Sequence, residues 1–171
     1  MKAFFTGHRW IDDNWRKEIN KLIDYALSRG VKHFYSGMAL GTDLLAAECL
    51  IRRNLDWTAV IPCRNQDELW KLKERNRYAR VLKTNPKQII LYEHYSPGVM
   101  QARNLWMIKR SDLCLSIYTG KQSGGTAMTV QTAAARGIPV VNINPLNHDF
   151  CLYQSRYQQL SLFEFDRVKN N

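Results

Sequence analysis

The sequence has few cysteines, and no two of them stand at the C-x-x-C spacing used by zinc sites and redox motifs. Its 171 residues contain four, which are Cys49, Cys63, Cys114 and Cys151. They lie far apart, and three of them fall in apolar or strand-like stretches. This usage argues against a disulfide framework and predicts reduced core residues of a cytoplasmic protein.

Two further absences narrow the class of protein. The four histidines show no spacing typical of metal ligands, so we expect no metal site and no required cofactor. No apolar run approaches the roughly 20 residues that a membrane-spanning helix needs, so we expect no membrane partner. The apolar stretch that follows Met1-Lys2 ends at Phe5, and it is too short for a signal peptide.

Acidic residues are scarce beside basic ones. The chain has 15 Asp and Glu against 25 Lys and Arg, and its formal net charge is +10. Such a balance favours an anionic partner, which is a nucleotide, a nucleic acid or another polyanion. The segment from Arg64 to Lys87 holds eight basic and three acidic residues, a net +5 that is half of the total. It is either a solvated surface or a contact surface for single-stranded nucleic acid.

What the sequence does contain is the pattern of one α/β domain. Hydrophobic residues make up 45% of the chain, which is the ordinary globular range. Apolar strand-like runs alternate with helical patterns as far as residue 143. The alternation predicts a Rossmann-like three-layer α/β fold, a mostly parallel sheet with helices on both faces. We expect one domain over 1–171, with its core in 1–145 and a tail, 146–171, that packs on the domain or on a partner subunit.

The boundaries of the expected elements follow from turn residues and helix caps. The predicted strands are short apolar runs at 2–6, 33–35, 57–61, 88–92, 113–118 and 138–143. The predicted helices have apolar residues three and four apart and lie at 13–29, 44–53, 67–83, 99–110 and 126–136. Pro62 is expected to end the third strand. The helix over 67–83 is expected to bury Leu69, Leu72, Ala79 and Leu82.

A glycine-rich turn after the fifth predicted strand is typical of a phosphate site. Gly124 and Gly125 have no Cβ, so a ligand can approach the backbone there. The helix that begins near Thr126 points free N–H groups and its positive dipole end at the same place. A tight structural turn is the alternative interpretation. Because the loops after the first, second and fifth strands all leave carboxyl ends, we expect them to converge on one site.

The loop after the first strand adds two candidate ligand groups. Arg9 follows Gly7 and can fork onto a phosphate, and His8 can donate a hydrogen bond or exchange a proton. A surface arginine beside a loop histidine is the alternative.

The loop after the second strand, Ser36 to Asp43, carries two glycines four residues apart. Asp43 falls in the first turn of the next helix, where it either stabilises the helix end or binds a ribose hydroxyl. Arg103, on the helix before the fifth strand, can point to the same sheet edge.

Taken in order, these motifs resemble the SLOG superfamily over residues 6–143. Thr6-Gly7-His8-Arg9 matches the opening motif of bacterial and phage SLOG proteins of the YpsA and YoqJ type. Residues 36–48 are similar to a Ser-Gly-x-Ala-x-Gly-x-Asp signature found also in the DNA-processing protein A family. Residues 100–131 resemble the LOG-type phosphoribohydrolases. The resemblance implies a Rossmann-like fold, a nucleotide-type ligand and a homodimer or larger homo-oligomer.

The similarity to LOG enzymes breaks at four residues of their Pro-Gly-Gly-x-Gly-Thr-x-x-Glu pattern, because Ser123, Ala127, Met128 and Gln131 replace its proline, third glycine, threonine and glutamate. Arg103 falls on the arginine that LOG enzymes carry on the preceding helix, but Gln131 stands where they have the glutamate. A glutamine cannot take up a proton or support an oxocarbenium-like state as a carboxylate does. The replacement argues against LOG-type hydrolysis and leaves Arg103, Asp43 and Glu48 as the catalytic candidates.

Three functions fit these observations. The first is binding of a nucleotide or an ADP-ribose-like ligand by a sensor, carrier or sequestering protein, for which the resemblance implies a role in phage biology or defence. The second is hydrolysis of the N-glycosidic bond of a nucleoside monophosphate or NAD-like substrate, and the third is binding of single-stranded DNA. The expected ligand-binding residues are Gly7, His8, Arg9, Ser36, Gly37, Met38, Gly41, Asp43, Arg103, Ser123, Gly124, Gly125, Thr126 and Gln131.

Overall fold

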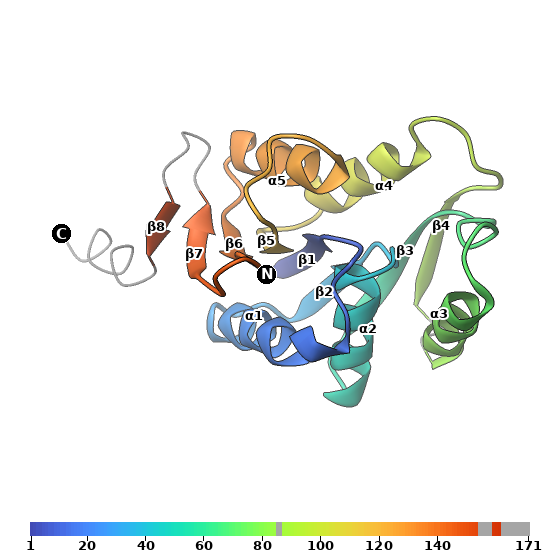
Figure 1. The fold of residues 1–171 in the computed structure, drawn as a ribbon, viewed down its shortest axis with the longest axis horizontal. Helices are drawn as coiled ribbons and strands as arrows, with labels where there is room; N and C mark the ends of the chain where they lie inside the picture. The colour runs from blue at the N-terminus through green and yellow to red at the C-terminus, as the bar shows by residue number, and fades with distance from the viewer. Residues whose placement is uncertain (85–86, 154–158, 162–171) are drawn as a thin grey trace.

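The computed structural model describes residues 1–84, 87–153 and 159–161. These residues build one sheet with the strand order β4-β3-β2-β1-β5-β6-β7-β8, enclosed between helices (Figure 1). The alternating pattern therefore predicted the fold class correctly, and the Rossmann-like three-layer α/β architecture is confirmed. The strands are β1 (Lys2–Gly7), β2 (His33–Ser36), β3 (Trp57–Cys63), β4 (Gln88–Tyr92), β5 (Leu113–Ile117), β6 (Val140–Ile143), β7 (Phe150–Tyr153) and β8 (Gln159–Ser161).

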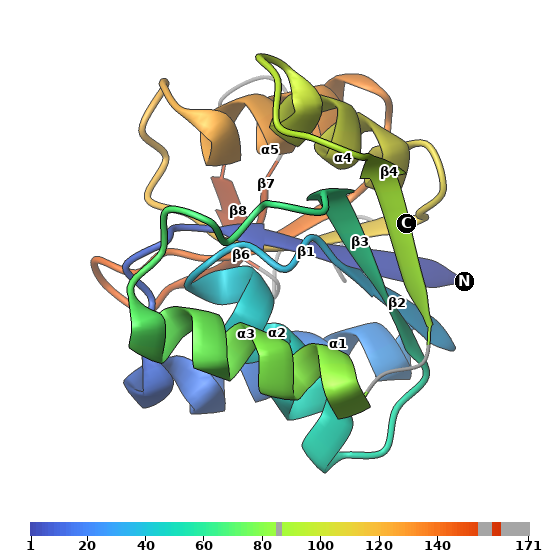
Figure 2. The same ribbon diagram turned by 90° about the vertical axis from the view of Figure 1, so that its right-hand side faces the viewer.

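Helices cover both faces of the sheet. One face carries α1 (Arg16–Ser28), α2 (Thr42–Arg52) and α3 (Leu72–Thr84), and the other carries α4 (Val99–Ile108) and α5 (Gly125–Ala135) (Figures 1 and 2). A 3-10 turn, η1 (Asp13–Trp15), precedes α1. In the part of the chain that the structure describes, no helix is long and apolar enough to cross a membrane.

The strand order reverses beside β1. From β1 the chain adds β2, β3 and β4 in turn on one side, and then returns to place β5 and β6 on the other. All of these neighbours are parallel, and the register sets Gly7 of β1 beside Ile117 of β5. The loops that follow β1 and β5 therefore leave the sheet side by side but turn to opposite faces. This divergence is the crevice in which open α/β sheets bind ligands.

Two apolar cores explain why the central strands are continuous hydrophobic runs. Successive side chains of a strand point to opposite faces, so Phe5 packs under α1 and α2 while its neighbour Phe4 packs under α4 and α5. A strand buried on both faces has no polar side, as the fully buried β3 and β5 illustrate. All four cysteines are buried.

The third strand continues through Pro62, and the expectation that proline would end it is wrong. The Ala59 N–H donates to the carbonyl of Lys87 at 3.0 Å, so odd-numbered residues of β3 bond to β4. The missing N–H of Pro62 would thus point towards β2. That neighbour has already ended, since its last registered pair is Ser36 with Ala59. The proline removes no bond from the ladder.

The basic helix is shorter than predicted and uses a different apolar stripe. It begins at Leu72 instead of residue 67, because the chain from 64 to 70 forms turns. The Glu74 carboxylate accepts a hydrogen bond at 3.0 Å from the N–H of Lys71, which caps the helix start. Leu69 and Leu72 are 95% and 72% exposed, and the residues that α3 buries are Tyr78 and Val81. Of the expected stripe, Leu82 is partly buried and packs against the core.

Part of the tail adds to the sheet in a way that the sequence pattern did not predict. Strand β7 pairs antiparallel with β6, with Phe150 beside Ile143, and β8 pairs antiparallel with β7. Cys151 and Leu152 are buried there, so residues 150–153 pack on their own domain. Other apolar residues of the tail lie outside the described residues, namely Tyr157, Leu162 and Phe163.

Candidate functional site

A cavity of about 440 Å³ lies at the point where the strand order reverses. We call it the switch-point cavity. Its walls come from the end of β1 and the loop after it, the loop after β2, the loop after β5, the starts of α2 and α5, and α4. The three loops expected to converge therefore meet there. The residues that line it are Thr6, Gly7, His8, Arg9, Ala39, Asp43, Met100, Arg103, Asn104, Lys121, Ser123, Gly124, Gly125 and Thr126.

Gly7 ends β1 where two helices begin. The Thr126 hydroxyl of α5 donates to the Gly7 carbonyl at 2.9 Å. On the other side, a Cβ added to Gly7 would lie 2.7 Å from the Cβ of Thr42, at the start of α2. No side chain fits at this position, because the two helix N-termini are drawn together around the strand end.

His8 holds the first loop against the loop after β5. Its backbone N–H donates to the carbonyl of Ile117 at 3.2 Å, and its Nε2 accepts from the Thr119 N–H at 3.0 Å. Since Nε2 accepts, the proton of the neutral ring is on Nδ1. Burial, and then the nearby charge of Lys121, lower the pKa of His8. The imidazole is therefore neutral at pH 7 and joins the two loops.

The second loop is folded tightly by its own side chains. The Ser36 hydroxyl donates to the Asp43 carbonyl at 2.8 Å and accepts from the Met38 N–H at 3.1 Å. Gly41 has a φ of 79°, and a Cβ there would lie 2.6 Å from the backbone of Arg9. Ser36, Met38 and Gly41 thus shape the cavity from behind, and none of them is among its lining residues.

Gly37 belongs to the same supporting layer. A Cβ at this position would lie 2.7 Å from the guanidinium carbon of Arg103. The carbonyl of Gly37 accepts a hydrogen bond from Nη1 of that arginine.

Arg103 and Asp43 form a buried pair at the base of the cavity. Their residues are 5% and 6% exposed, and the Arg103 Nη1 lies 4.0 Å from the Asp43 Oδ2. Burial raises the pKa of Asp43 to about 6, although Arg103, the Ala39 N–H and Arg9 each act in the opposite direction. Arg103 makes no close hydrogen bond to Asp43, because it donates to the Gly37 carbonyl and, through Nε, to the Asn104 side chain at 2.7 Å.

The third loop presents backbone to the cavity. Gly124 is the N-cap of α5 with a φ of 100°, and Gly125 is its first residue. A Cβ added at either glycine would meet no atom within 4 Å. The first N–H groups of a helix lack acceptors within the helix, and its N-terminus carries partial positive charge. Lys121 adds a full positive charge to the same wall.

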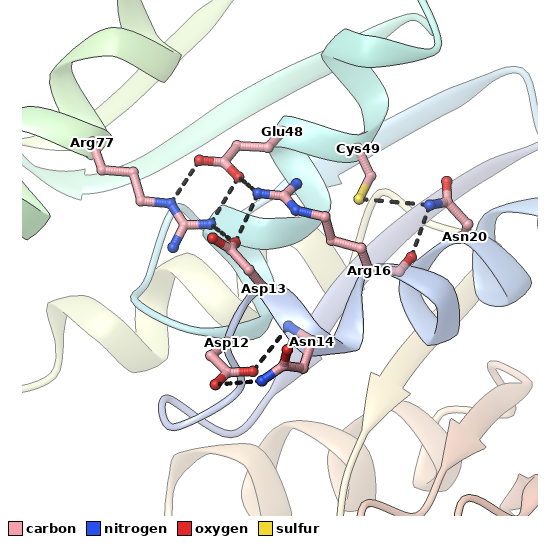
Figure 3. Close-up of polar contacts among 8 residues, drawn as sticks. All are labelled: Asp12, Asp13, Asn14, Arg16, Asn20, Glu48, Cys49 and Arg77. Carbon is pink, nitrogen blue, oxygen red and sulfur yellow. Dashed lines mark hydrogen bonds and ion pairs between the residues drawn. The ribbon is translucent and has the colours of Figure 1, made fainter.

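Two of the predicted site residues lie away from the cavity. Glu48 accepts hydrogen bonds at 2.5 Å from Arg16 and at 2.6 Å from Arg77, in a network that also includes Asp13 (Figure 3). Gln131 donates from its amide to the side chain of Gln122 at 3.0 Å. Among the described residues, Asp43 is consequently the one carboxylate that lines the switch-point cavity. No group of three acidic, histidine or cysteine residues in the described ranges is placed to hold a metal ion.

Sequence reasoning did not select several residues of the cavity wall. Asn104 follows Arg103 directly, and its amide donates to the Thr129 hydroxyl at 2.7 Å, which ties α4 to the second turn of α5. Lys121 stands within the glycine loop, where a charged residue among small ones was a usable signal. Met100 and Ala39 gave no such signal, because only the packing of helix on loop brings them to the cavity.

A protein-family model matches residues 8–142, which covers most of the chain and all three loops. It is the YpsA model, described as the YspA SLOG family. This chain belongs to that SLOG family. The superfamily expected from the three motifs is thereby confirmed.

Curated relatives of this SLOG chain are similar at low identity. It is 31% identical over 108 residues to the uncharacterized SPbeta prophage-derived protein YoqJ of Bacillus subtilis, a match covering 53% of this chain and 63% of YoqJ. It is 23% identical over 151 residues to the UPF0398 protein OB1025 of Oceanobacillus iheyensis, covering 84% of this chain and 82% of that protein. The chain thus spans less than two thirds of YoqJ.

Two solved structures share the fold. The first is DNA processing protein A from Helicobacter pylori, which is described for its single-stranded DNA binding mode. It has a TM-score of 0.65 at 18% identity, and the match covers 99% of this chain and 79% of the H. pylori chain. The second is DNA processing protein A from Streptococcus pneumoniae, with a TM-score of 0.65 at 20% identity. That match covers 86% of this chain and 52% of the S. pneumoniae chain. At these identities the likeness establishes the Rossmann-like fold of the SLOG chain.

Proposed function

We propose that this SLOG protein binds a phosphorylated nucleotide-type ligand, such as a nucleoside monophosphate or ADP-ribose, in the switch-point cavity. The observation that carries the proposal is the convergence of the glycine turn at the start of α5 with Arg9, Lys121 and the buried Arg103 around one cavity. Backbone N–H groups at a helix N-terminus together with arginine are the donors that phosphate prefers.

The parts of the cavity suit different parts of such a ligand. Gly124 and Gly125 leave space for phosphate oxygens to approach the backbone, and Arg9 is exposed enough to close over them. Asp43, at the base, accepts a hydrogen bond from a hydroxyl when it is ionised. A ribose hydroxyl is the group of a nucleotide that supplies this donor. The volume of about 440 Å³ lies in the range of small-molecule sites.

The proposal is tested by filling the space at the glycine turn. Gly125→Val introduces a branched side chain where a Cβ meets no protein atom, so the fold should keep its thermal stability while phosphate is blocked. Calorimetric titration with AMP, ADP-ribose and inorganic phosphate should show binding to wild type and at least a roughly 100-fold loss in the variant. Met128→Val is the matched control, since Met128 lies on the same helix and outside the cavity. Equal affinities in Gly125→Val and wild type would refute the proposal.

Cleavage of an N-glycosidic bond is the second candidate function, and the position of Asp43 favours it. An acid whose pKa lies near neutrality can transfer a proton at physiological pH, and Asp43 has a pKa of about 6. Incubation with AMP or NAD, followed by chromatography, distinguishes the two functions. A binder releases no free base or nicotinamide. A hydrolase releases it at an ordinary rate of about 1 per second or more, and loses that activity in Asp43→Asn.

Single-stranded DNA is a third candidate ligand, because the H. pylori protein that shares this fold binds it. The basic segment contributes less to this idea than its charge suggests, since Arg77 pairs with Glu48 and Asp13 and Arg75 pairs with Asp67. Competition decides between the ligands. An oligonucleotide that displaces AMP shares the switch-point cavity, whereas one that binds Gly125→Val as tightly as wild type uses another surface.

A further inference from the structure

Strand β4 is the outermost strand at one end of the sheet. In Figure 2 it lies nearest the viewer, with α4 over one face of the sheet and α3 over the other. Within the described residues its one sheet neighbour is β3. The strand is also apolar and partly exposed, since Ile90 and Tyr92 are 37% and 46% exposed. An exposed apolar edge strand is a template for pairing with another strand.

The backbone of β4 points the required groups outwards. Because Ala59 donates to the Lys87 carbonyl, odd-numbered residues of β4 bond to β3. The N–H and C=O groups of Ile90 and Tyr92 therefore point away from the sheet. Natural proteins commonly protect such an edge with inward-pointing charges, proline or a bulge within the strand. The sequence Gln-Ile-Ile-Leu-Tyr of β4 contains none of these.

We propose that β4 pairs antiparallel with β4 of a second copy of this chain, centred on Ile90. This inference is independent of the ligand proposed above. In such a ladder the outward-pointing residues of β4, which are even-numbered, must face even-numbered residues of the partner strand. The numbers of two paired residues therefore add up to an even sum. The sum of 180 sets Ile90 opposite Ile90 of the partner subunit and places Ile89 opposite Leu91 of the partner subunit.

The charges at the ends of the strand agree with this register. It places Lys87 opposite Glu93 of the partner subunit, twice in the symmetric pair, so opposite charges meet where like charges would repel. Each of the two residues also has an ion-pair partner in its own chain, Asp56 for Lys87 and Arg64 for Glu93. A two-fold arrangement of identical strands is self-complementary, as closed dimers require. The result is one continuous sheet across two subunits.

Mass measurement with a proline variant tests the proposal. Light scattering of the wild type at micromolar concentration should give twice the 20.0 kDa mass of the chain. Ile90→Pro removes an outward N–H that β3 does not use, so the strand should keep its place while the dimer is lost. Far-UV circular dichroism and the Tm check the fold of the variant. A wild-type monomer, or a folded Ile90→Pro that is still a dimer, overturns the proposal.

A cross-linking pair tests the register even if the proline variant does not fold. In the proposed ladder the two Ile90 Cα atoms lie about 5.5 Å apart, which suits a disulfide. Ile90→Cys should form a covalent dimer on mild oxidation, in about tenfold greater yield than the control. The control is Leu105→Cys on α4, because Leu105 is 39% exposed and thus as accessible as Ile90. Equal yields from the two variants contradict the interface.

Discussion

The pKa values of two carboxylates on one helix are shifted in opposite directions in this protein. Asp43 lies in the first turn of α2 and Glu48 lies five residues later, and each is close to arginines. Glu48 receives hydrogen bonds from Arg16 and Arg77, and these hold its pKa below the ordinary value despite partial burial. Asp43 is more deeply buried and has an arginine only at 4.0 Å, and its pKa is raised to about 6.

The difference separates a structural network from a candidate binding site. At Glu48 both carboxylate oxygens accept hydrogen bonds from arginines, and the ion pairs with Asp13 join η1, α1, α2 and α3 (Figure 3). At the switch-point cavity, Arg103 donates its hydrogen bonds to Gly37 and Asn104. The Asp43 carboxylate has only a 4.0 Å ion pair with Arg103 and a 3.4 Å contact with the Ala39 N–H. A carboxylate whose oxygens already accept short hydrogen bonds from arginine has less to offer a ligand than one that is weakly paired.

The largest expected effect comes from removing the buried cation. Arg103→Leu leaves Asp43 without its nearest positive charge and the Gly37 carbonyl without its donor. Breaking one partner of a buried pair lowers the free energy of unfolding by about 3–5 kcal/mol. Urea denaturation measures it, with Arg136→Leu as a control at an exposed arginine. A loss no larger than in the control would show that Arg103 does not hold the second loop.

The next largest effect is the pH dependence of the free energy of unfolding, to which Asp43 and Glu48 contribute with opposite sign. The pKa of Asp43 rises from 3.8 to about 6 on folding, so the folded state binds more protons between these values and stability falls as pH rises through them. A shift of about two units corresponds to about 3 kcal/mol.

The substitution Asp43→Asn isolates this contribution. It should raise the free energy of unfolding at pH 7 and flatten its decline between pH 4 and 6. Denaturation of wild type and variant across that range measures both. A variant that is less stable than wild type at pH 7 would mean that the attraction of Arg103 outweighs burial at Asp43.

The smallest expected effect is at Glu48. Its pKa is lowered on folding, so it stabilises the protein above the ordinary value of 4.5 and that contribution is lost as pH falls. Glu48→Gln keeps the shape and removes the charge. It should lower the free energy of unfolding at pH 7 by about 1–2 kcal/mol, because partial exposure screens the pairs.

The affinity of the same variant for a ligand tests whether the Glu48 network is separate from the binding site. Glu48→Gln should leave the affinity for AMP unchanged, since Glu48 lies outside the cavity. Calorimetry checks it. A lost affinity would place Glu48 in the binding site after all.

Much of the cavity that forms the candidate site could be predicted from the sequence because its signals are local. Glycines beside strand ends and an arginine directly after His8 are properties of short segments, and parallel strands bring their carboxyl ends to one edge. Glu48 could not be placed in this way. Its side chain lies one and a half turns from Asp43 on the same helix, and the helical period turns it towards η1 and α3 instead.

The sequence by itself determined the alternation of strands and helices, the buried central strands and the loops that carry glycine, since each depends on residues close together in the chain. Only the tertiary structure decided which charges pair. Arg16 meets Glu48 across 32 residues and Arg103 meets Gly37 across 66, and no local pattern records such distances. The same is true of Pro62, which the sheet tolerates only because its neighbouring strand has already ended.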